Sequence, residues 1–235
     1  MQPELAQQMN SPAIDPALKP PAAETGSSSA RNPAARRLRI LEAATRLFLD
    51  EGYGQATTNA LVRIVGGSKA TLYSHFPSKE QLFGAVVDHV LARLVAATGD
   101  FPASGDDAET SLAELGEGLL ELILAPDHIA LARMVIGEAH RFPEIGAIYH
   151  AHGPALAQEG VRDFLQAHDI LPGATSQELR DAAEWFTGRL IHRAFVDALC
   201  SRSRAPDRAE LRRLAADTAH SFVRHFGRGG QARAL

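Results

Sequence analysis

The chain has 235 residues, 45% of them hydrophobic and 6% aromatic, which suits one large domain or two modest ones with an ordinary core. Its formal net charge of -4 excludes a chain that is basic throughout, and no apolar run approaches the roughly 20 residues needed to span a membrane. The single cysteine, Cys200, excludes an intramolecular disulfide and fits a reducing compartment, so we expect a cytoplasmic protein with no membrane partner.

The charges are unevenly distributed along the chain. Residues 31–80 hold eight Lys or Arg and four acidic residues, whereas residues 81–235 hold fifteen and twenty-one. This pattern predicts a basic module attached to an acidic body. Residues 1–35 are dense in Pro, Ala, Ser and polar residues and contain no apolar core of a secretion signal. We therefore expect them to form a disordered arm.

Helical periodicity begins at Arg36 and stops at Gly52. Thr57 is the predicted N-cap of a second, short helix, which the pair Gly66-Gly67 interrupts. The periodicity of the first helix rests on apolar residues that fall on one stripe. That stripe consists of Ile40, Leu41, Ala44, Leu47 and Phe48.

A third short helix is predicted directly after the two glycines. Ser68 can cap its start, and Pro77 ends it after Phe76. Ser78 and Gln81 then have the spacing of a capping box, which opens a long amphipathic helix.

A segment rich in Gly, Pro and Asp, residues 98–107, separates these helices from the rest of the chain. No alternating apolar and polar stretch predicts a strand. We therefore expect an all-α protein of about nine helices, with a three-helix helix-turn-helix domain at 36–80 and a larger C-terminal helical bundle at 81–227. A disordered tail is expected at 228–235. The later predicted helices are 109–125, 127–141, 145–169, 176–200 and 207–227.

The stretch GGSKATLYSHFPSKEQLF, residues 66–83, carries the most specific signal. It is not a phosphate-binding P-loop, because Gly67 is followed by Ser68 and no strand precedes it. A helix-turn-helix needs a tight turn, often with Gly, and a second helix that fits a major groove roughly 12 Å wide. On a helical wheel, Leu72 and Phe76 share the inward face. The outward face holds Ala70, Thr71 and Ser74, with Lys69 and Tyr73 at its edges.

Small outward groups suit approach to base edges, whereas Lys and Tyr suit phosphates. Lys79 lies in the first turn of the next helix, where free N–H groups and the helix dipole favour a phosphate. Each of these features is common in helical proteins, so a purely structural role is the alternative; their joint order favours DNA binding. The predicted DNA contacts are Arg36, Thr57, Ser68, Lys69, Ala70, Thr71, Tyr73, Ser74, His75 and Lys79.

Residues 36–83 resemble the DNA-binding domain of the TetR family of bacterial transcriptional regulators. The resemblance rests on FLDEGY (48–53), Thr57 and SKATLYSHFPSKEQLF (68–83), followed by a long helix. The turn Val65-Gly66-Gly67 departs from the family pattern because it lacks the usual apolar anchor. Ile64 stands at a position that is often polar, and we expect it to make an extra packing contact.

RMVIGEAHRFPEIGAIYHAHGP, residues 133–154, resembles the AefR-like subset of C-terminal domains in this family. The resemblance implies a body that dimerises and encloses an effector pocket. Because apolar residues at helical spacing usually pack in a core, that alternative stays open for each pocket candidate. The candidates are Met134, Phe142, Tyr149, Phe164, Trp185 and Arg189.

The last two predicted helices, 176–200 and 207–227, carry apolar stripes that suit a four-helix interface in a homodimer. Such a dimer reads two half-sites about 34–36 Å apart, one turn of DNA. The alternative, that both stripes face their own core, also remains open. The stripes are Leu179, Ala183, Phe186, Leu190 and Ala194, and Leu211, Leu214, Ala215, Thr218, Phe222 and Phe226.

Neither a metal site nor a catalytic site is predicted. His150 and His152 are two residues apart and lie on different helix faces. Glu138, His140 and Asp181 form no triad or paired-carboxylate spacing, and no cofactor is expected. The favoured function is a homodimeric repressor that binds a double-stranded DNA operator and is released by a small-molecule effector. The alternatives are an architectural or occlusion factor without an effector, and an all-α enzyme.

Overall fold

The computed structural model describes residues 32–98, 107–200 and 206–227. The expected tail at 228–235 and residues 1–31 of the expected disordered arm lie outside the described residues. The chain divides into two units, residues 1–36 and residues 37–235. Of the first unit, the structure describes the opening turn of a helix, where Ala34 N–H donates to Asn32 Oδ1 at 3.0 Å.

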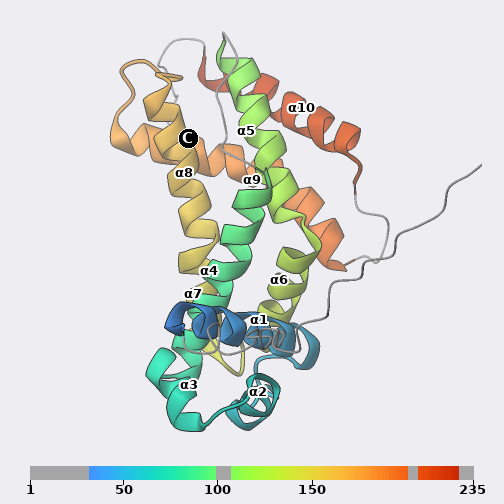
Figure 1. Cartoon of the computed structure of the whole chain (residues 1–235). Coiled ribbons are helices and arrows are strands. Elements are labelled where there is room, and N and C mark those ends of the chain that lie inside the picture. Colours follow the sequence, from blue (N-terminus) through green and yellow to red (C-terminus); the bar gives the residue numbers. More distant parts are fainter. Residues whose placement is uncertain (1–31, 99–106, 201–205, 228–235) are drawn as a thin grey trace, which may run out of the picture. The chain divides into compact units, whose positions relative to one another are not determined.

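The described residues form ten helices and no strand, so the predicted all-α class is confirmed (Figure 1). The first helix begins at Pro33 instead of Arg36, because a proline at the first helical position loses no hydrogen bond. The helices are α1 (Pro33–Glu51), α2 (Thr58–Val65), α3 (Lys69–His75), α4 (Lys79–Thr98), α5 (Ala108–Ile123), α6 (Pro126–Glu138), α7 (Pro143–His152), α8 (Pro154–Ala167), α9 (Ser176–Cys200) and α10 (Arg208–Phe226).

The three predicted N-caps are confirmed. Each hydroxyl oxygen accepts a hydrogen bond from a backbone N–H three residues later, which satisfies a donor that the helix itself leaves free. The turn between α2 and α3 has φ of +70° at Gly66 and +100° at Gly67, values that favour glycine. The capping bonds run to Thr57 from Ala60 at 3.1 Å, to Ser68 from Thr71 at 3.2 Å and to Ser78 from Gln81 at 3.1 Å.

The predicted helix 145–169 is instead two helices, α7 and α8, which separate at Gly153. Pro154 has no N–H and cannot continue the hydrogen bonds of α7, but its fixed φ suits the first position of a new helix. The N–H of Gly153 closes α7 on the carbonyl of Tyr149 at 3.0 Å. The break therefore has a local cause in the Gly-Pro step.

The first of two core clusters is built around three aromatic rings from α1, the turn after it and α4. The ring centroids of Phe48 and Tyr53 are 5.6 Å apart, and that of Phe83 lies 5.7 Å and 5.4 Å from them. All three side chains are buried, and α6 and α7 complete the cluster, so packing is continuous from α1–α4 into these helices. The α6 and α7 members are Leu131, Ala132, Val135, Ile145 and Tyr149.

The second core cluster contains most residues of the two apolar stripes, for which the sequence allowed either a dimer interface or the core of their own chain. Most stripe residues of α9 and α10 are buried against their own chain, and the remaining members, Ala194, Leu214 and Phe226, pack partly buried at the cluster's edge. The buried members of both stripes are therefore core of their own chain. The buried members are Leu179, Ala183, Phe186, Leu190, Leu211, Ala215, Thr218 and Phe222.

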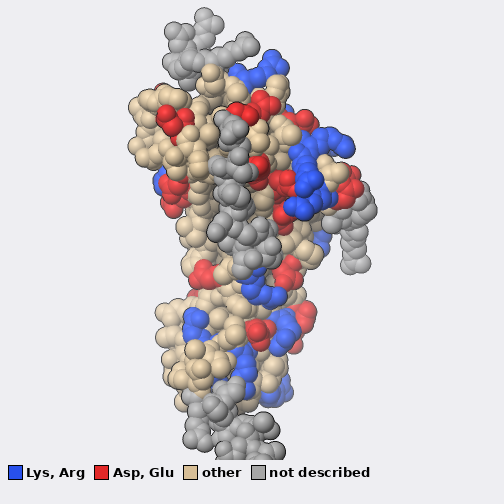
Figure 2. Space-filling view, turned by 45° about the horizontal axis from the view of Figure 1, so that its top comes forward, with Lys and Arg blue, Asp and Glu red and all other residues tan. Residues whose placement is uncertain are grey.

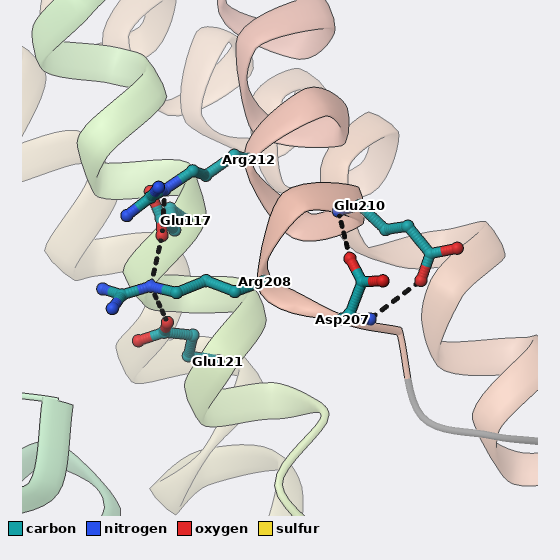
Figure 3. Close-up of polar contacts among 6 residues, drawn as sticks. All are labelled: Glu117, Glu121, Asp207, Arg208, Glu210 and Arg212. Atoms are coloured by element: carbon teal, nitrogen blue, oxygen red, sulfur yellow. Dashed lines mark hydrogen bonds and ion pairs between the residues drawn. The ribbon is translucent and has the colours of Figure 1, made fainter.

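Helix α10 packs along α5, and the two lie side by side in Figure 1. Gly116 allows this close approach, because a Cβ there would lie 3.2 Å from Ala215 Cβ and 3.4 Å from Leu190 Cδ1. The start of α10 is fixed by a capping box, in which Glu210 N–H donates to Asp207 and Asp207 N–H donates to Glu210. Figure 3 shows both bonds.

Ion pairs add a polar contact between the same two helices (Figure 3). Arg208 Nε lies 3.0 Å from Glu117 Oε1 and 3.2 Å from Glu121 Oε1, and Arg212 Nε lies 2.9 Å from Glu117 Oε1. Both arginines are mostly exposed, so solvent screens these pairs and they add little to stability. They join the start of α10 to the second half of α5.

A buried polar pair joins α6 and α7. His128 is 4% exposed; its Nδ1 lies 2.8 Å from the carbonyl of Ile123 and its Nε2 lies 3.0 Å from Tyr149 Oη. Because a carbonyl can only accept, Nδ1 carries the proton and Nε2 accepts from the tyrosine hydroxyl. Burial lowers the pKa of His128, which the Ile123 carbonyl partly opposes, and burial raises the pKa of Tyr149 to about 12.

This pair predicts a pH-dependent stability. Because the folded state holds the pKa of His128 below its ordinary value of 6.5, the unfolded chain takes up this proton first as the pH falls. The free energy of unfolding should therefore decrease between about pH 7 and about pH 5. In urea unfolding, the His128→Gln variant should have a lower free energy of unfolding at neutral pH than the unaltered protein. Its free energy of unfolding should also decrease less steeply as the pH falls. Equal slopes for the two proteins would contradict this assignment.

Candidate nucleic-acid interface

Helices α2 and α3 form a helix-turn-helix whose inward side chains are anchored in the first core cluster. Leu61 of α2 is 2% exposed, and Leu72 of α3 and Phe76 at its end are each 3% exposed. Phe76 also lies under the guanidinium of Arg37, which is 4.8 Å from the ring centroid. The inward face predicted for α3 is therefore confirmed.

The other side of α3 faces away from the core. Lys69, Ala70, Tyr73 and Ser74 are exposed, with Tyr73 at 44%, and Thr71 is half-buried. Among the described residues, none covers Ala70 or Ser74 in the middle of this face, since both are exposed. The surface therefore consists of small groups between a cation and a phenol.

The hydroxyl groups of α3 have defined hydrogen-bonding roles. Ser74 Oγ donates to the carbonyl of Thr71 at 2.8 Å, and the hydroxyls of Ser68 and Thr71 lie 3.1 Å apart. Because the Ser74 proton is engaged by the helix itself, its oxygen is left as an acceptor toward an outside donor. The predicted contact His75 is half-buried beside this face.

The two predicted DNA contacts at helix starts, Thr57 and Lys79, differ in exposure and in hydrogen bonding. Thr57 is exposed, and its oxygen accepts the capping bond from Ala60, which leaves its own proton free for a phosphate. Lys79 is half-buried, its ammonium donates to the carbonyl of Tyr53, and Nζ lies 4.3 Å from the Tyr53 ring centroid. Burial lowers the pKa of Lys79, while the nearby carboxylates of Glu138, Glu80 and Glu144 oppose that shift.

An ammonium has three donors, so the Tyr53 carbonyl leaves Lys79 further capacity for a phosphate. Its contact with DNA stays a prediction, as does that of Arg36, which lies in the first unit of the chain. Figure 2 shows more basic than acidic side chains over the lower part of the face in view, where α1 to α3 lie. Over the upper part, which holds α5 and α10, the two signs are mixed.

The expected packing contact of Ile64 is wrong, because this side chain is 56% exposed. Leu61 and Val65 face the core, and Ile64 lies to one side of that stripe, next to the turn. Gly66 and Gly67 have no side chains, and a Cβ at Gly66 would meet nothing within 4 Å. The turn therefore offers Ile64 nothing to pack against.

The six effector candidates do not belong to one cluster. Met134, Phe142 and Tyr149 pack in or against the first core cluster, whereas Phe164 and Trp185 pack against the second. Arg189 is exposed. His128, the hydrogen-bond partner of Tyr149, carries no signal in the sequence, because the two residues lie on different helices. The assignment of an effector pocket to these residues stays a prediction.

The described part of the chain has no group of three or more His, Cys, Asp or Glu placed to hold a metal ion. His152 Nδ1 instead lies 2.6 Å from Asp88 Oδ1 at the surface, where it joins α7 to α4. None of the described helices combines the length and the apolar character needed to cross a bilayer.

Each half of the chain matches the model of a known protein family. The family model of bacterial regulatory proteins of the tetR family matches residues 40–86. The model of the C-terminal domain of AefR-like transcriptional repressors matches residues 110–228, just over half of the chain. The first match contains α2, the turn and α3, and the second contains the helices that follow residue 110.

Individual proteins agree with these matches. The chain is 30% identical over 130 residues to the transcriptional repressor AcnR of Corynebacterium efficiens, a match that spans 55% of this chain and 64% of that repressor. A TetR-family regulator from Mesorhizobium loti has 25% sequence identity and a TM-score of 0.68, covering 83% of this chain and 98% of that one. The flavonoid-responsive regulator FrrA has the same fold, with 22% identity and a TM-score of 0.69 over 86% of this chain and all of that one.

A single family model thus covers more than half of the sequence, and a second one covers the helix-turn-helix, whose outward side chains are exposed in the described part of the chain. The chain belongs to the TetR family of DNA-binding transcriptional regulators, with an AefR-like C-terminal domain.

Proposed function

We propose that the protein is a homodimeric transcriptional repressor that binds its operator through α3 and leaves it when a small-molecule effector binds the helical body. The observation that carries the proposal is the division of α3 into two faces. Leu72 and Phe76 are anchored in the core, while Ala70 and Ser74 are exposed. Such a helix can enter the major groove with small groups against base edges.

Binding to DNA draws on both sequence-independent and sequence-dependent contacts. Lys69, Lys79 and the hydroxyl of Thr57 are proposed to contact phosphates, which fix the orientation of α3 but carry no sequence information. Ala70, Thr71 and Ser74 are proposed to lie nearest the bases. Because phosphate contacts release counterions, the affinity should fall steeply as the salt concentration rises.

Dimerisation is proposed because regulators of this family act as dimers. The apolar stripes of α9 and α10 are occupied in the core of their own chain, so the contact we propose uses the sides of these helices that face away from it. Val196 on α9 is an apolar side chain of this kind, with 41% exposure. A two-fold dimer presents its two α3 helices to half-sites about 34–36 Å apart.

Release by an effector is proposed as a population shift. The dimer binds DNA in one arrangement of its α3 helices, and the effector binds better to an arrangement with a different spacing. To empty the operator, the effector must prefer that state by roughly 10⁴-fold, about 5.5 kcal/mol. A protein that binds its operator but shows no thermal shift and no release with any of a broad set of small apolar ligands is instead an occlusion or architectural factor.

Selection of bound sequences from random DNA tests the function as a whole. The purified protein should enrich a palindrome whose half-site centres lie about one helical turn apart. Enrichment of a single half-site contradicts the dimer, and recovery of no sequence preference at low salt contradicts sequence-specific regulation.

Substitutions of two neighbouring residues on α3 distinguish a loss of DNA binding from a loss of stability. Tyr73→Ala should weaken operator binding about tenfold and leave the free energy of unfolding almost unchanged, because this side chain is 44% exposed. The matched control Leu72→Ala should instead cost about 2–5 kcal/mol of stability, because it leaves a cavity in the core. Circular dichroism melts and fluorescence anisotropy measure the two effects. A Tyr73→Ala variant that melts as early as Leu72→Ala shows that Tyr73 is part of the core.

The phosphate contacts predict a change in salt dependence. Lys69→Ala and Lys79→Ala should each weaken binding to all DNA sequences alike and reduce the slope of log affinity against log salt by about 1. Titrations of the selected operator and of an unrelated duplex at several salt concentrations measure this slope. If a variant keeps the slope of the unaltered protein but changes its base preference, the substituted lysine does not contact phosphate.

A further inference from the structure

The end of α6 contacts the turn between α1 and α2, which comprises Gly52, Tyr53 and Gly54 (the 52–54 turn). The Gly54 N–H donates to Glu138 Oε2 at 2.6 Å, a short bond of the charge-assisted kind. Beside it, the rings of Phe142 and Tyr53 meet edge to face, with centroids 5.2 Å apart. One carboxylate and one aromatic ring from the body thus hold this turn.

Both glycines of the turn are matched to this contact. Gly52 has φ of +84°, and a Cβ there would lie 2.2 Å from Glu138 Oε1. Gly54 has no positive φ, yet a Cβ on it would lie 2.9 Å from Glu138 Oε2 and 3.0 Å from Phe142 Cε2. Backbone conformation does not require glycine at position 54. A side chain there would instead displace the Glu138 carboxylate and crowd the Phe142 ring.

Glu138 is the last residue of α6, where the negative end of the helix dipole disfavours a carboxylate. Its charge therefore does not stabilise its own helix, and its bonding partner lies 84 residues away in the sequence. Elsewhere on α6, Arg133 donates to the carbonyls of Leu199 and Ala198 at 3.0 Å and 2.5 Å, at the end of α9. Helix α6 thus bonds both to the last turn of α9 and to the 52–54 turn.

The 52–54 turn is hydrogen-bonded to one predicted DNA contact, Lys79, and leads directly to another, Thr57. Its Tyr53 carbonyl accepts the ammonium of Lys79 at the start of α4. Three residues beyond Gly54, Thr57 caps α2, which leads through the glycine turn to α3. A displacement of the 52–54 turn therefore moves the start of α2 and changes the hydrogen bond of Lys79 together.

We propose that Glu138 is a positioning residue for DNA binding: its carboxylate fixes the 52–54 turn and, through it, the placement of the helix-turn-helix on the body. The proposal rests on the proposed function. We do not expect Glu138 itself to touch DNA. It acts through the backbone of Gly54.

If Glu138 acted only through its charge, its removal would change the DNA affinity in the opposite direction, which makes the proposal testable. DNA is a polyanion, so removal of a carboxylate close to a DNA-binding surface should strengthen binding if charge alone matters. Glu144 on α7 is a second half-buried carboxylate whose charge acts on both Tyr53 and Lys79, but no hydrogen bond joins it to the 52–54 turn among the described contacts. It provides a control of matched charge.

The experiment compares Glu138→Ala, Glu138→Gln and Glu144→Ala in the full chain, with the operator obtained by selection. Glu138→Ala should weaken operator binding about tenfold, because a charged hydrogen bond to the turn is lost. Glu138→Gln should bind nearly as the unaltered protein does, since its amide oxygen can accept the same bond. Glu144→Ala should bind equally or more tightly. Hydrogen exchange of the Gly54 amide should accelerate in Glu138→Ala alone.

The opposite outcomes overturn the proposal. Operator binding by Glu138→Ala that equals or exceeds that of the unaltered protein shows that the charge only repels DNA. Equal losses in Glu138→Gln and Glu138→Ala show that the hydrogen bond does not carry the effect. A general loss of thermal stability in Glu138→Ala, with exchange accelerated across α1–α4, shows a merely structural role.

A second variant tests the same contact from the other side. Gly54→Ala keeps the N–H but places a Cβ against Glu138 and Phe142, so it should weaken operator binding and accelerate exchange in the turn. In the Glu138→Ala background, Gly54→Ala should reduce operator affinity by a smaller factor than it does in the unaltered protein. The reason is that one of the two side chains that its Cβ would crowd is gone. Strictly additive losses contradict a direct contact. If the unaltered protein selects no operator, the proposed function fails, and the exchange measurements still test the positioning of the turn.

Discussion

Burial of Leu72 and Phe76 beneath α3 is the interaction on which the rest of the structure depends. Both side chains are 3% exposed, and they fix which side of this seven-residue helix is turned away from the core. A helix this short is marginal on its own. Its N-cap at Ser68, its glycine turn and its two core anchors hold it in a single orientation, and this orientation leaves Ala70 and Ser74 exposed.

The core that anchors α3 does not end with α4. Phe48, Tyr53 and Phe83 form its aromatic centre, and Leu131, Val135 and Ile145 from α6 and α7 belong to the same cluster. A boundary at residues 80 and 81 was predicted from composition, yet apolar packing is continuous across it. Movement of α6 or α7 can therefore reach the helix-turn-helix directly, through packed side chains and through the Glu138 contact, with no flexible linker between them.

Local chemistry could be predicted from the sequence, and contacts between distant segments could not. The caps at Thr57, Ser68 and Ser78 depend on residues three positions apart, so their spacing was sufficient to place them. Periodicity identified the apolar sides of α9 and α10 but could not say what covers them, and the structure places their own chain there. The contact between Glu138 and Gly54 joins residues with no sequence pattern in common. Ile64 was misjudged because its neighbours in the turn are glycines, which provide no packing surface.

The most direct test of the two-faced α3 is a bulky side chain on its outward face. Ala70→Leu adds apolar volume at an exposed position, so we expect the free energy of unfolding to stay unchanged within about 0.5 kcal/mol. Operator binding should be lost in the same preparation. Stability lost together with binding would show that Ala70 faces the core, and operator affinity that survives the change would show that α3 does not approach DNA closely.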